Sequence, residues 1–468
     1  MVLLTIFFLV FIFYKETFFY YFVSDDFILL SYKKNLADLF RIDPLNNHYT
    51  PVNSMANFFL YQLFGLNPIP YHIFIVLVHI VNIYLVYQLS KVFIKNKVKN
   101  VLTALVFAFF FANYEVVYWI GGNNNSLMVT FYLMALLSLI NYVKVGKNIF
   151  AFLFQVAFVF AFLTHEYAVS LIFVGVVYWW IFSKIKNKKE FFKLFLFPTV
   201  VFLTTTILKI IFVKMPLLVR TPSILKFIAF SLRSFVYLFI PNPYLVDKLP
   251  NALIPLIFLV ILVFLLKFTK NKQTLFLLIW AAATIFVYSI TSAPQARYFY
   301  LSFIPIIIYI LSVVKIELPR MSFPRRRESR LKLIDWVPSF EGMTNSSTAI
   351  IYLVFIFISG VVFLQNQKYY WHLSSEITKN VIADIKKSYP RPQKDDVLYF
   401  VNLPDSSNEG IWKAYVFRAG FKELLNSVVG VHPKKIVYLT TDKRLPQIKK
   451  NTIVFVYKEE LKSVVLLK

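Results

Sequence analysis

The chain alternates between long apolar runs and short polar interruptions over most of its length. Apolar runs of membrane-spanning length predict helical crossings, because a backbone in lipid must bond its N–H and C=O groups within the segment. About eleven such runs are present, at roughly 2–22, 72–94, 100–114, 126–143, 149–163, 167–183, 194–213, 251–267, 274–291, 299–314 and 348–365. The pattern predicts an α-helical polytopic membrane protein with about eleven spans.

The polar interruptions predict how the spans are oriented. If the spans alternate, the loop lysines fall on one side, and that side should be cytoplasmic by the positive-inside rule. These residues are Lys95, Lys97, Lys99, Lys144, Lys147, Lys184, Lys186, Lys188, Lys189, Lys267, Lys270 and Lys272. No small-residue cleavage site follows the first run, so it is expected to be an uncleaved span. The N-terminus is then inside and the C-terminus outside.

One further apolar segment, about 222–240, would break this alternation if it crossed the membrane. It carries Lys226 and Arg233 in its interior. We expect a helix that lies along the outer interface or packs between spans. The alternative is a true span with inverted topology downstream.

Two regions depart from the apolar pattern. Residues 316–347 form a basic segment that contains Phe-Pro-Arg-Arg-Arg-Glu-Ser and Gly-Met-Thr. It resembles a translated bacterial interspersed DNA repeat, and we expect a cytoplasmic insertion without function, since long loops cost little. A nucleic-acid or targeting role for the arginine run is the alternative.

The second region, residues 366–468, has the composition of a soluble domain, following a membrane domain at residues 1–365. Alternating runs predict strands, and two segments favour helix. The strands are expected at 397–401, 435–439 and 452–457, and the helices at 376–388 and 412–429. We expect a small extracytoplasmic α/β domain. It has no nucleophile, metal or phosphate-loop motif, so a structural cap or acceptor-docking module is its expected role.

The composition agrees with the apolar pattern. Hydrophobic residues make up 59% of the chain and aromatic residues 19%, and Cys is absent, which excludes disulfides and cysteine nucleophiles. The net charge of +27 would suit nucleic-acid binding only in a soluble basic domain, whereas the basic residues lie largely in short loops. The charge therefore indicates contact with lipid headgroups, and no nucleic-acid partner is expected.

The strongest candidate for chemistry is Ser24-Asp25-Asp26, where the first apolar run ends. Adjacent carboxylates at the mouth of a span are costly unless they are used. One of them can cap the following helix, but a cap needs a single acceptor. We expect Asp25 and Asp26 to be catalytic, with Asp26 slightly favoured because Asp25 can serve as the cap.

Other polar residues fall in loops on the same predicted side. Glu115 supplies another carboxylate, which with the aspartates could bind a divalent cation or accept a proton. His165 and Glu166 mark a hairpin, and Arg297 opens a late span with donors suited to phosphate. Caps, ion pairs and interfacial anchors are the structural alternatives. His79, inside the second span, is expected to hydrogen-bond between helices.

Several short motifs follow one another in a recognisable order. They are Asp25-Asp26, His48-Tyr49-Thr50-Pro51-Val52-Asn53, Leu63-Phe64-Gly65-Leu66-Asn67-Pro68, Asn113-Tyr114-Glu115-Val116-Val117-Tyr118-Trp119-Ile120, Leu163-Thr164-His165-Glu166-Tyr167-Ala168 and Arg297-Tyr298. This order resembles the GT-C glycosyltransferases, in the bacterial branch of protein O-mannosyltransferases and lipid A aminoarabinose transferases. The similarity is best over residues 20–185. Two features depart from the family: Lys-Glu is commoner there than His165-Glu166, and the basic insertion has no counterpart.

The resemblance implies inverting transfer of a sugar from a polyprenyl-phosphate carrier to a glycolipid, polysaccharide or protein of the envelope. The reaction would take place on the outer side of the bacterial inner membrane. Catalytic residues would be Asp25, Asp26 and Glu115, with a divalent cation at these three as an alternative to no cofactor. Substrate-binding residues would be Lys33, Lys34, His48, Asn53, His165, Glu166, Arg297 and Tyr298.

Other functions for a polytopic basic protein are a transporter or flippase of lipid-linked sugars, a polymerase or ligase, and a non-catalytic scaffold. Transporters tend to place charges at mid-membrane and to show internal repeats. In this sequence the acids lie at span ends and no internal repeat is evident. The glycosyltransferase is therefore the favoured function.

Overall fold

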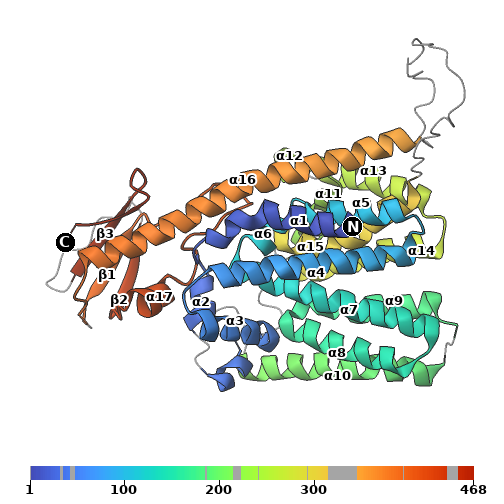
Figure 1. Ribbon diagram of the computed structural model, residues 1–468, viewed down its shortest axis with the longest axis horizontal. Coiled ribbons are helices and arrows are strands. Elements are labelled where there is room, and N and C mark those ends of the chain that lie inside the picture. Colours follow the sequence, from blue (N-terminus) through green and yellow to red (C-terminus); the bar gives the residue numbers. More distant parts are fainter. Residues whose placement is uncertain are drawn as a thin grey trace, which may run out of the picture.

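A computed structural model shows a helical bundle that continues at one end into a small sheet domain (Figure 1). The structure describes residues 2–31, 35–42, 48–184, 187–213, 223–240, 242–291, 294–314, 345–393, 395–439 and 452–467. Residues 316–344 of the expected insertion, and also Lys33 and Lys34, lie outside this set.

The first half of the chain is helical. It contains α1 (Val2–Tyr14), η1 (Lys15–Phe19), α2 (Asp26–Ser31), η2 (Leu36–Phe40), α3 (Pro51–Phe64), α4 (Ile69–Phe93), α5 (Lys97–Ala108), α6 (Asn113–Val117), η3 (Ile120–Gly122), α7 (Asn123–Val145), α8 (Asn148–Thr164), η4 (Glu166–Val169), α9 (Ser170–Phe182) and α10 (Lys188–Val213). The second half contains α11 (Ile224–Phe239), α12 (Pro243–Lys248), α13 (Leu253–Phe268), α14 (Lys272–Thr291), α15 (Ala296–Val313), α16 (Asn345–Ser388), β1 (Val397–Val401), α17 (Phe421–Leu424), η6 (Leu425–Val429), β2 (Lys435–Leu439), β3 (Thr452–Lys458) and β4 (Ser463–Leu466).

Seven helical segments in the described part of the chain are long and apolar enough to cross a membrane. They are Val2–Phe19, Ile69–Phe93, Ile120–Val145, Lys188–Ile211, Lys272–Ile290, Ala296–Val313 and Ile351–Ser388. Three shorter apolar helical segments are Asn148–Thr164, Glu166–Phe182 and Leu253–Phe268. The chain is therefore a multi-pass membrane protein, whereas the count of eleven spans stays a prediction.

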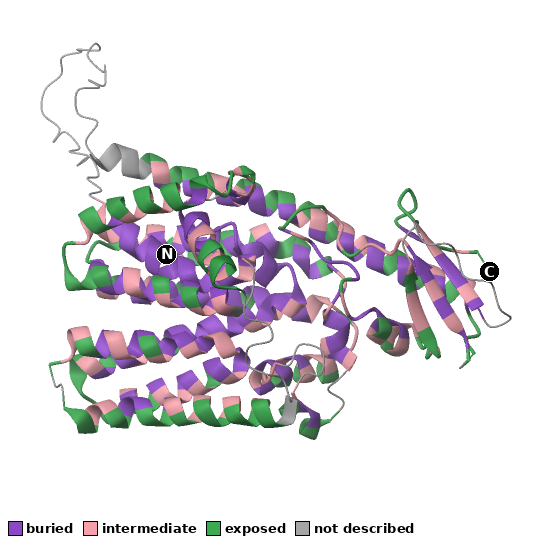
Figure 2. Cartoon of the chain, turned by 180° about the vertical axis from the view of Figure 1, so that it is seen from behind, coloured by how far each residue is buried: buried purple, intermediate pink, exposed green. Residues whose placement is uncertain are grey.

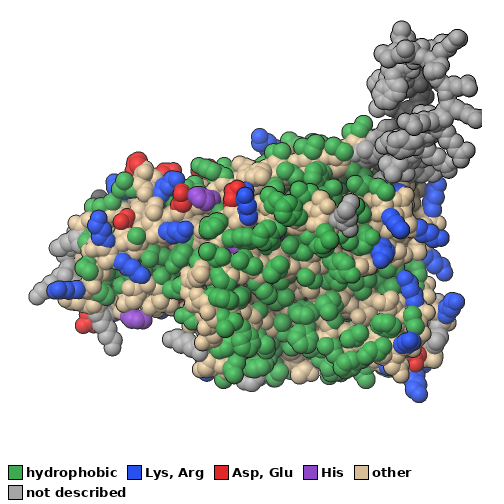
Figure 3. All heavy atoms as spheres, viewed as in Figure 1, with side chains coloured by type: hydrophobic (Ala, Val, Ile, Leu, Met, Phe, Trp, Pro, Cys, Tyr) green, Lys and Arg blue, Asp and Glu red, His purple; other side chains and the backbone are tan. Residues whose placement is uncertain are grey.

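The described loop lysines lie at the end of the bundle away from the sheet domain, as the positive-inside pattern predicts (Figure 3). Large apolar side chains cover the sides of the bundle, and this is the surface expected to face lipid. Helix α15 has the largest buried share of the seven segments. Buried residues fill the interior of the bundle (Figure 2). Helix α10 has the smallest buried share of the seven and lies at the edge.

The expected crossing at 100–114 ends early, because α5 stops at Ala108 and the short α6 follows inside the bundle. The Ala108 carbonyl accepts hydrogen bonds from Asn113 Nδ2 (3.0 Å), Tyr14 Oη (3.3 Å) and His79 Nε2 (3.2 Å). Irregular backbone at membrane depth is tolerated when side chains satisfy it in this way. His79 Nδ1 must then accept from Tyr300 Oη at 2.7 Å. The predicted interhelical role of His79 is confirmed.

Helix α11, in the ambiguous 222–240 segment, packs across α13, α14 and α15 near the ends that face the sheet domain. Phe227 meets Phe286 of α14, and Phe235 meets Phe258 of α13, with ring centroids 5.3 and 5.0 Å apart. Arg233 donates to Asn251 at 2.7 Å. The segment therefore packs against other helices, and whether it also crosses the membrane stays a prediction.

The C-terminal domain is a four-stranded sheet in the order β2-β1-β3-β4, with β1 parallel to both β2 and β3 and with β4 antiparallel. All three predicted strands are present, and β4 was not predicted. Helix α16 runs without a break through residue 366, so the predicted domain boundary falls inside a helix.

The expected helix at 412–429 is wrong for its first part. Residues 412–420 form irregular and bridged backbone, in which Ser406 pairs with Tyr415, and helical turns begin only at Phe421. Buried side chains follow one another from Ala414 to Phe417 without a helical period, because this segment is enclosed on both sides.

Candidate active site

The turn Ser24-Asp25 lies between the extended residues after η1 and the start of α2. Ser24 is buried and has φ +49°, a left-handed conformation that costs a non-glycine residue about 1–3 kcal/mol. Its N–H donates to the Val416 carbonyl of the C-terminal domain at 2.8 Å, and its hydroxyl donates to Asp25 Oδ1 at 3.2 Å. The strained turn is therefore held in place by the C-terminal domain, and strain of this kind is typical of functional sites.

Asp26 is only 1% exposed, and both of its carboxylate oxygens accept backbone hydrogen bonds. Oδ2 accepts from the Val23 N–H at 2.9 Å, and Oδ1 accepts from the Gly121 N–H at 2.7 Å. Burial raises the pKa of Asp26 to about 8, although these two N–H groups favour the charged form. Asp26 thus fastens α2 to the Gly121-Gly122 turn, whereas Asp25 is partly exposed.

Glu115, on α6, is paired with Arg297 at the start of α15. Glu115 Oε2 accepts from the Arg297 backbone N–H at 2.9 Å, and Oε1 meets the guanidinium. The side chains are 3% and 15% exposed. The guanidinium carbon lies 5.5 Å from the Trp119 ring centre and 5.2 Å from that of Tyr298. The predicted phosphate clamp and the predicted second carboxylate are therefore partners in one ion pair.

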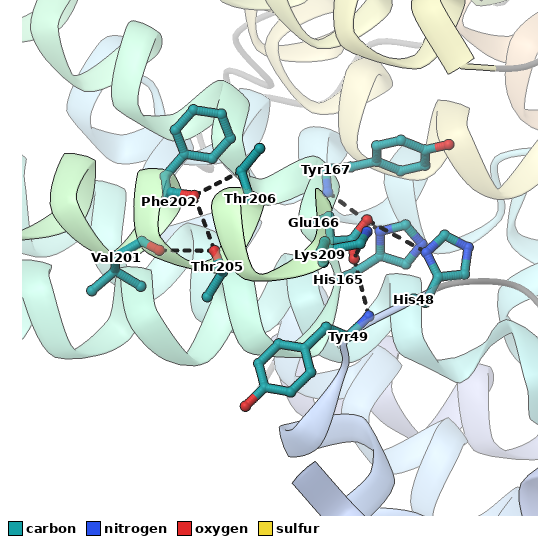
Figure 4. A network of polar contacts seen from close by, with 10 residues as sticks. All are labelled: His48, Tyr49, His165, Glu166, Tyr167, Val201, Phe202, Thr205, Thr206 and Lys209. Atoms are coloured by element: carbon teal, nitrogen blue, oxygen red, sulfur yellow. Dashed lines mark hydrogen bonds and ion pairs between the residues drawn. The ribbon is translucent and has the colours of Figure 1, made fainter. Parts of the chain in front are cut away.

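A second polar cluster surrounds Glu166 at the α8–α9 hairpin (Figure 4). Glu166 Oε1 lies 2.5 Å from Lys209 Nζ of α10 and accepts from the Tyr49 N–H at 3.0 Å, while Oε2 lies 3.5 Å from His48 Nδ1. The His165 ring centre is 5.5 Å from that of His48. The expected neighbours His48, His165 and Glu166 are thus brought together, and Lys209 joins them.

Tyrosines connect the two clusters. The Tyr167 hydroxyl is 3.4 Å from the Tyr298 hydroxyl, and their ring centres are 5.2 Å apart. Tyr167 follows Glu166 in the chain and stacks on His165, whereas Tyr298 follows Arg297 and lies beside its guanidinium. The ion pair and the Glu166 cluster therefore belong to one continuous polar region at the end of the bundle.

The C-terminal domain contributes two residues that the sequence analysis missed. Tyr415 packs on Trp119 with ring centres 5.5 Å apart, and the Arg418 guanidinium lies 4.7 Å above the Tyr415 ring. Burial raises the pKa of Tyr415; the carboxylates of Glu115 and Asp25 act in the same direction, and the nearby arginines oppose them. The signal that could have revealed them is the run of aromatic residues ending in Arg418 within an otherwise polar domain.

Lys209 was also missed, although a lysine within an apolar run is informative by itself. It lies within the long apolar α10, where an ionisable residue is expected to face protein and to have a partner. The Lys209 side chain is 27% exposed and pairs with Glu166, so it places a positive charge at the edge of the site.

Two further predictions concern Asn53 as a substrate-binding residue and a divalent cation at the carboxylates. Asn53, on α3, is buried, and its side-chain carbonyl oxygen has no hydrogen-bond partner among the described residues. Within the described part of the chain, no group of three or more His, Asp and Glu residues could hold a metal ion. With Glu115 paired to Arg297 and Asp26 bonded to two N–H groups, the predicted cation ligands do not fit a metal.

Comparison with known proteins gives a structural likeness. No family model and no curated protein matches the sequence. The fold is similar to the crystal structure of ArnT from Cupriavidus metallidurans in the apo state, with a TM-score of 0.51 and 12% identity over 86% of this chain and 82% of that one. For ArnT bound to undecaprenyl phosphate the TM-score is 0.49, with 12% identity over 97% of this chain and 92% of that one. The likeness to the apo structure shows that the two chains share a fold.

Proposed function

We propose that this chain is a glycosyltransferase that moves a sugar from a polyprenyl-phosphate carrier to an acceptor in the bacterial envelope. The observation that carries the proposal is the partly exposed Asp25, set in a strained turn. Asp25, Glu115 and Arg297 all act electrostatically on Tyr415, which packs on the Trp119 ring that the Arg297 guanidinium also faces. A carboxylate can remove the proton from the acceptor hydroxyl, and a guanidinium can stabilise the negative charge that is left on the carrier phosphate. The GT-C fold agrees with this reaction.

Asp25 is the proposed base, in place of Asp26, because Asp26 has both oxygens occupied by backbone N–H groups. In the reaction, the acceptor hydroxyl oxygen forms a bond to the anomeric carbon while the bond from that carbon to the phosphate oxygen breaks. The hydroxyl proton passes to Asp25, and the electron pair remains on the polyprenyl phosphate. A single displacement of this kind inverts the anomeric carbon.

The leaving phosphate needs positive charge that is already in position. Arg297 is oriented by Glu115 but has five N–H donors, so the pairing does not exhaust them. Lys209 supplies further positive charge on the Glu166 side of the same region, where His48 also lies. The carrier's polyprenyl chain would lie in the bilayer against the apolar sides of the bundle, with the reaction on the outer side of the inner membrane.

The decisive experiment compares Asp25→Asn with the exposed control Asp395→Asn in membranes supplied with undecaprenyl-phosphate sugars and total envelope lipids. Release of free undecaprenyl phosphate is measured. Because a general base contributes about 10²–10⁴-fold, Asp25→Asn should lower the rate by that factor, with its melting temperature unchanged. Wild-type release by Asp25→Asn would refute the proposed base.

A further inference from the structure

A cavity lies at the lysine-rich end of the bundle, opposite the candidate active site. It encloses about 360 Å³. It opens where α4, α7 and α9 end and where α14 begins. The residues that line it are Val92, Phe93, Val143, Lys144, Tyr178, Phe182, Lys184 and Gln273. Its volume is within the range of small-molecule sites, and none of the polar groups of the proposed reaction contributes to it.

Aromatic side chains form the inner wall of this cavity. The fully buried Phe276 of α14 stacks with Phe93 at 5.9 Å and 12° between ring planes. Tyr178 and Phe182 pack against the same ring at 5.2 and 5.9 Å. These contacts join α4, α9 and α14 at this level and form an apolar surface that a hydrocarbon chain can cover.

The rim of the cavity is positive. Lys144, on α7, and Lys184, just after the end of α9, are both exposed. Gln273 lies in the first turn of the 20-residue α14, whose N-terminus carries partial positive charge. None of the eight lining residues is acidic. The nearby Glu190 is already engaged by the Tyr142 hydroxyl and lies 3.7 Å from Lys193 Nζ. The rim therefore favours an anion.

The cavity also lies at the depth where lipid headgroups are expected. Helices α4 and α9, both apolar, end at Phe93 and Phe182, which line the cavity, and the basic loops begin directly after them. We propose that it binds an anionic phospholipid. The phosphodiester lies between Lys144 and Lys184, the Gln273 amide donates to it, and the first part of an acyl chain lies on the aromatic wall. Basic pockets between membrane helices are suited to such headgroups.

The test uses the purified full-length chain and native mass spectrometry with phosphatidylglycerol or phosphatidylethanolamine as the probe. The variants are Lys144→Gln with Lys184→Gln, and separately Gln273→Glu, which adds a carboxylate to the rim. The matched control is Lys188→Gln with Lys189→Gln, which removes the same charge at the same end but outside the cavity. All substituted positions are exposed, so folding should be preserved.

The wild type should retain phosphatidylglycerol in preference to phosphatidylethanolamine. Each cavity lysine should account for about fivefold in affinity, and the double variant for about thirtyfold, while the control stays within about twofold of the wild type. Gln273→Glu should weaken binding in the same direction. An equal loss in the control would show general charge attraction, and full displacement by inorganic phosphate would show a site for the free anion. Either result would overturn the proposal, as would wild-type binding in both cavity variants.

Discussion

Asp25 and Asp26 are consecutive residues with opposite surroundings. The backbone N–H groups of Val23 and Gly121 enclose the Asp26 carboxylate, whereas Asp25 is partly exposed and accepts from the Ser24 hydroxyl. A buried carboxylate that accepts two N–H bonds is suited to positioning, and a partly exposed one is suited to proton transfer. The difference arises from burial and not from the chemistry of the side chain.

Asp26→Asn should therefore affect stability. An amide can accept only one of the two N–H bonds, and leaving the other unmet costs about 1–3 kcal/mol, so the melting temperature should fall. The raised pKa of Asp26 means that the folded state retains its proton up to about pH 8, so the wild type loses stability as the pH rises from about 4 to about 8. The gap in melting temperature between wild type and Asp26→Asn should narrow over that range. A gap that widens would contradict the assigned role.

At the scale of single residues, the sequence indicated which side chains gather but not how they pair. Asp25, Glu115, Glu166 and Arg297 were all expected at one end, because each lies at a span end on the same predicted side. That Glu115 would pair with Arg297 depends on contacts across 182 positions of the chain, which no local pattern encodes. The choice between the two aspartates depends in the same way on Gly121, which lies 95 positions away.

Among the elements, the turn from α6 through η3 into α7 controls the site most directly. Gly122 adopts an ordinary right-handed conformation, with φ −76°, so flexibility is not the reason for a glycine here. A Cβ at this position would lie 2.0 Å from the Glu115 carbonyl oxygen. The turn therefore needs a residue without a side chain, because the backbone that carries Glu115 passes directly against it.

Gly122→Ala should displace the Glu115 backbone and disturb the Arg297 pair. A shift of about 1 Å at a positioned group can cost roughly 100-fold in rate, so carrier release should fall by about that factor. The control is Gly146→Ala, which has open space but φ +75° and should lose about 1 kcal/mol of stability without loss of rate. Equal rates in both variants would argue against the role of this turn.

The elements that the sequence predicted correctly are those with a regular pattern of apolar residues. The parallel strands β1, β2 and β3 and the long apolar helices follow from alternation and from apolar length. The end of α5 at Ala108 could not be predicted, since Phe109, Phe110 and Phe111 continue the apolar run, and the helix stops only because distant side chains satisfy the freed carbonyls. The irregular 412–420 segment could not be predicted either, because it is buried on both sides and its apolar residues follow no regular period.

For the molecule as a whole, the C-terminal domain is a wall of the candidate site. Trp412 Nε1 donates to Asp247 Oδ2 at 2.7 Å, next to α11 and its Arg233. A Cβ at Gly420 would lie 2.4 Å from the Ser24 carbonyl oxygen, so the two parts are in close backbone contact. The expected role of this domain as a cap or acceptor-docking module stays a prediction.

Trp412→Phe keeps an aromatic ring but removes the N–H group that meets Asp247. A hydrogen bond to a charged group contributes about 1.5–3 kcal/mol. Its loss should weaken the contact between the C-terminal domain and α12, and carrier release should fall several-fold. Limited proteolysis of the full chain should cut faster between α16 and β1. The control Trp180→Phe, at a 65% exposed position, should match the wild type in both assays.

The predicted topology can be tested cleanly because the chain has no native cysteine. Glu409→Cys lies on the exposed surface of the sheet domain, and Lys270→Cys lies in the loop between α13 and α14 at the lysine-rich end. In intact cells a membrane-impermeant maleimide should label the first variant and not the second. Labelling of Lys270→Cys but not of Glu409→Cys would contradict the predicted orientation.

Helix α16 sets both the height and the rotational phase of the sheet domain. Its 44 residues extend about 66 Å, roughly twice the thickness of a hydrocarbon core, so much of it stands clear of the lipid. At Gly360 it is held so close to the Phe109 carbonyl that a Cβ would lie 2.3 Å away. Each residue added or removed beyond that point would turn the sheet by about 100° and carry Val416 away from Ser24. The contact between Val416 and Ser24 therefore constrains the length of this helix beyond Gly360.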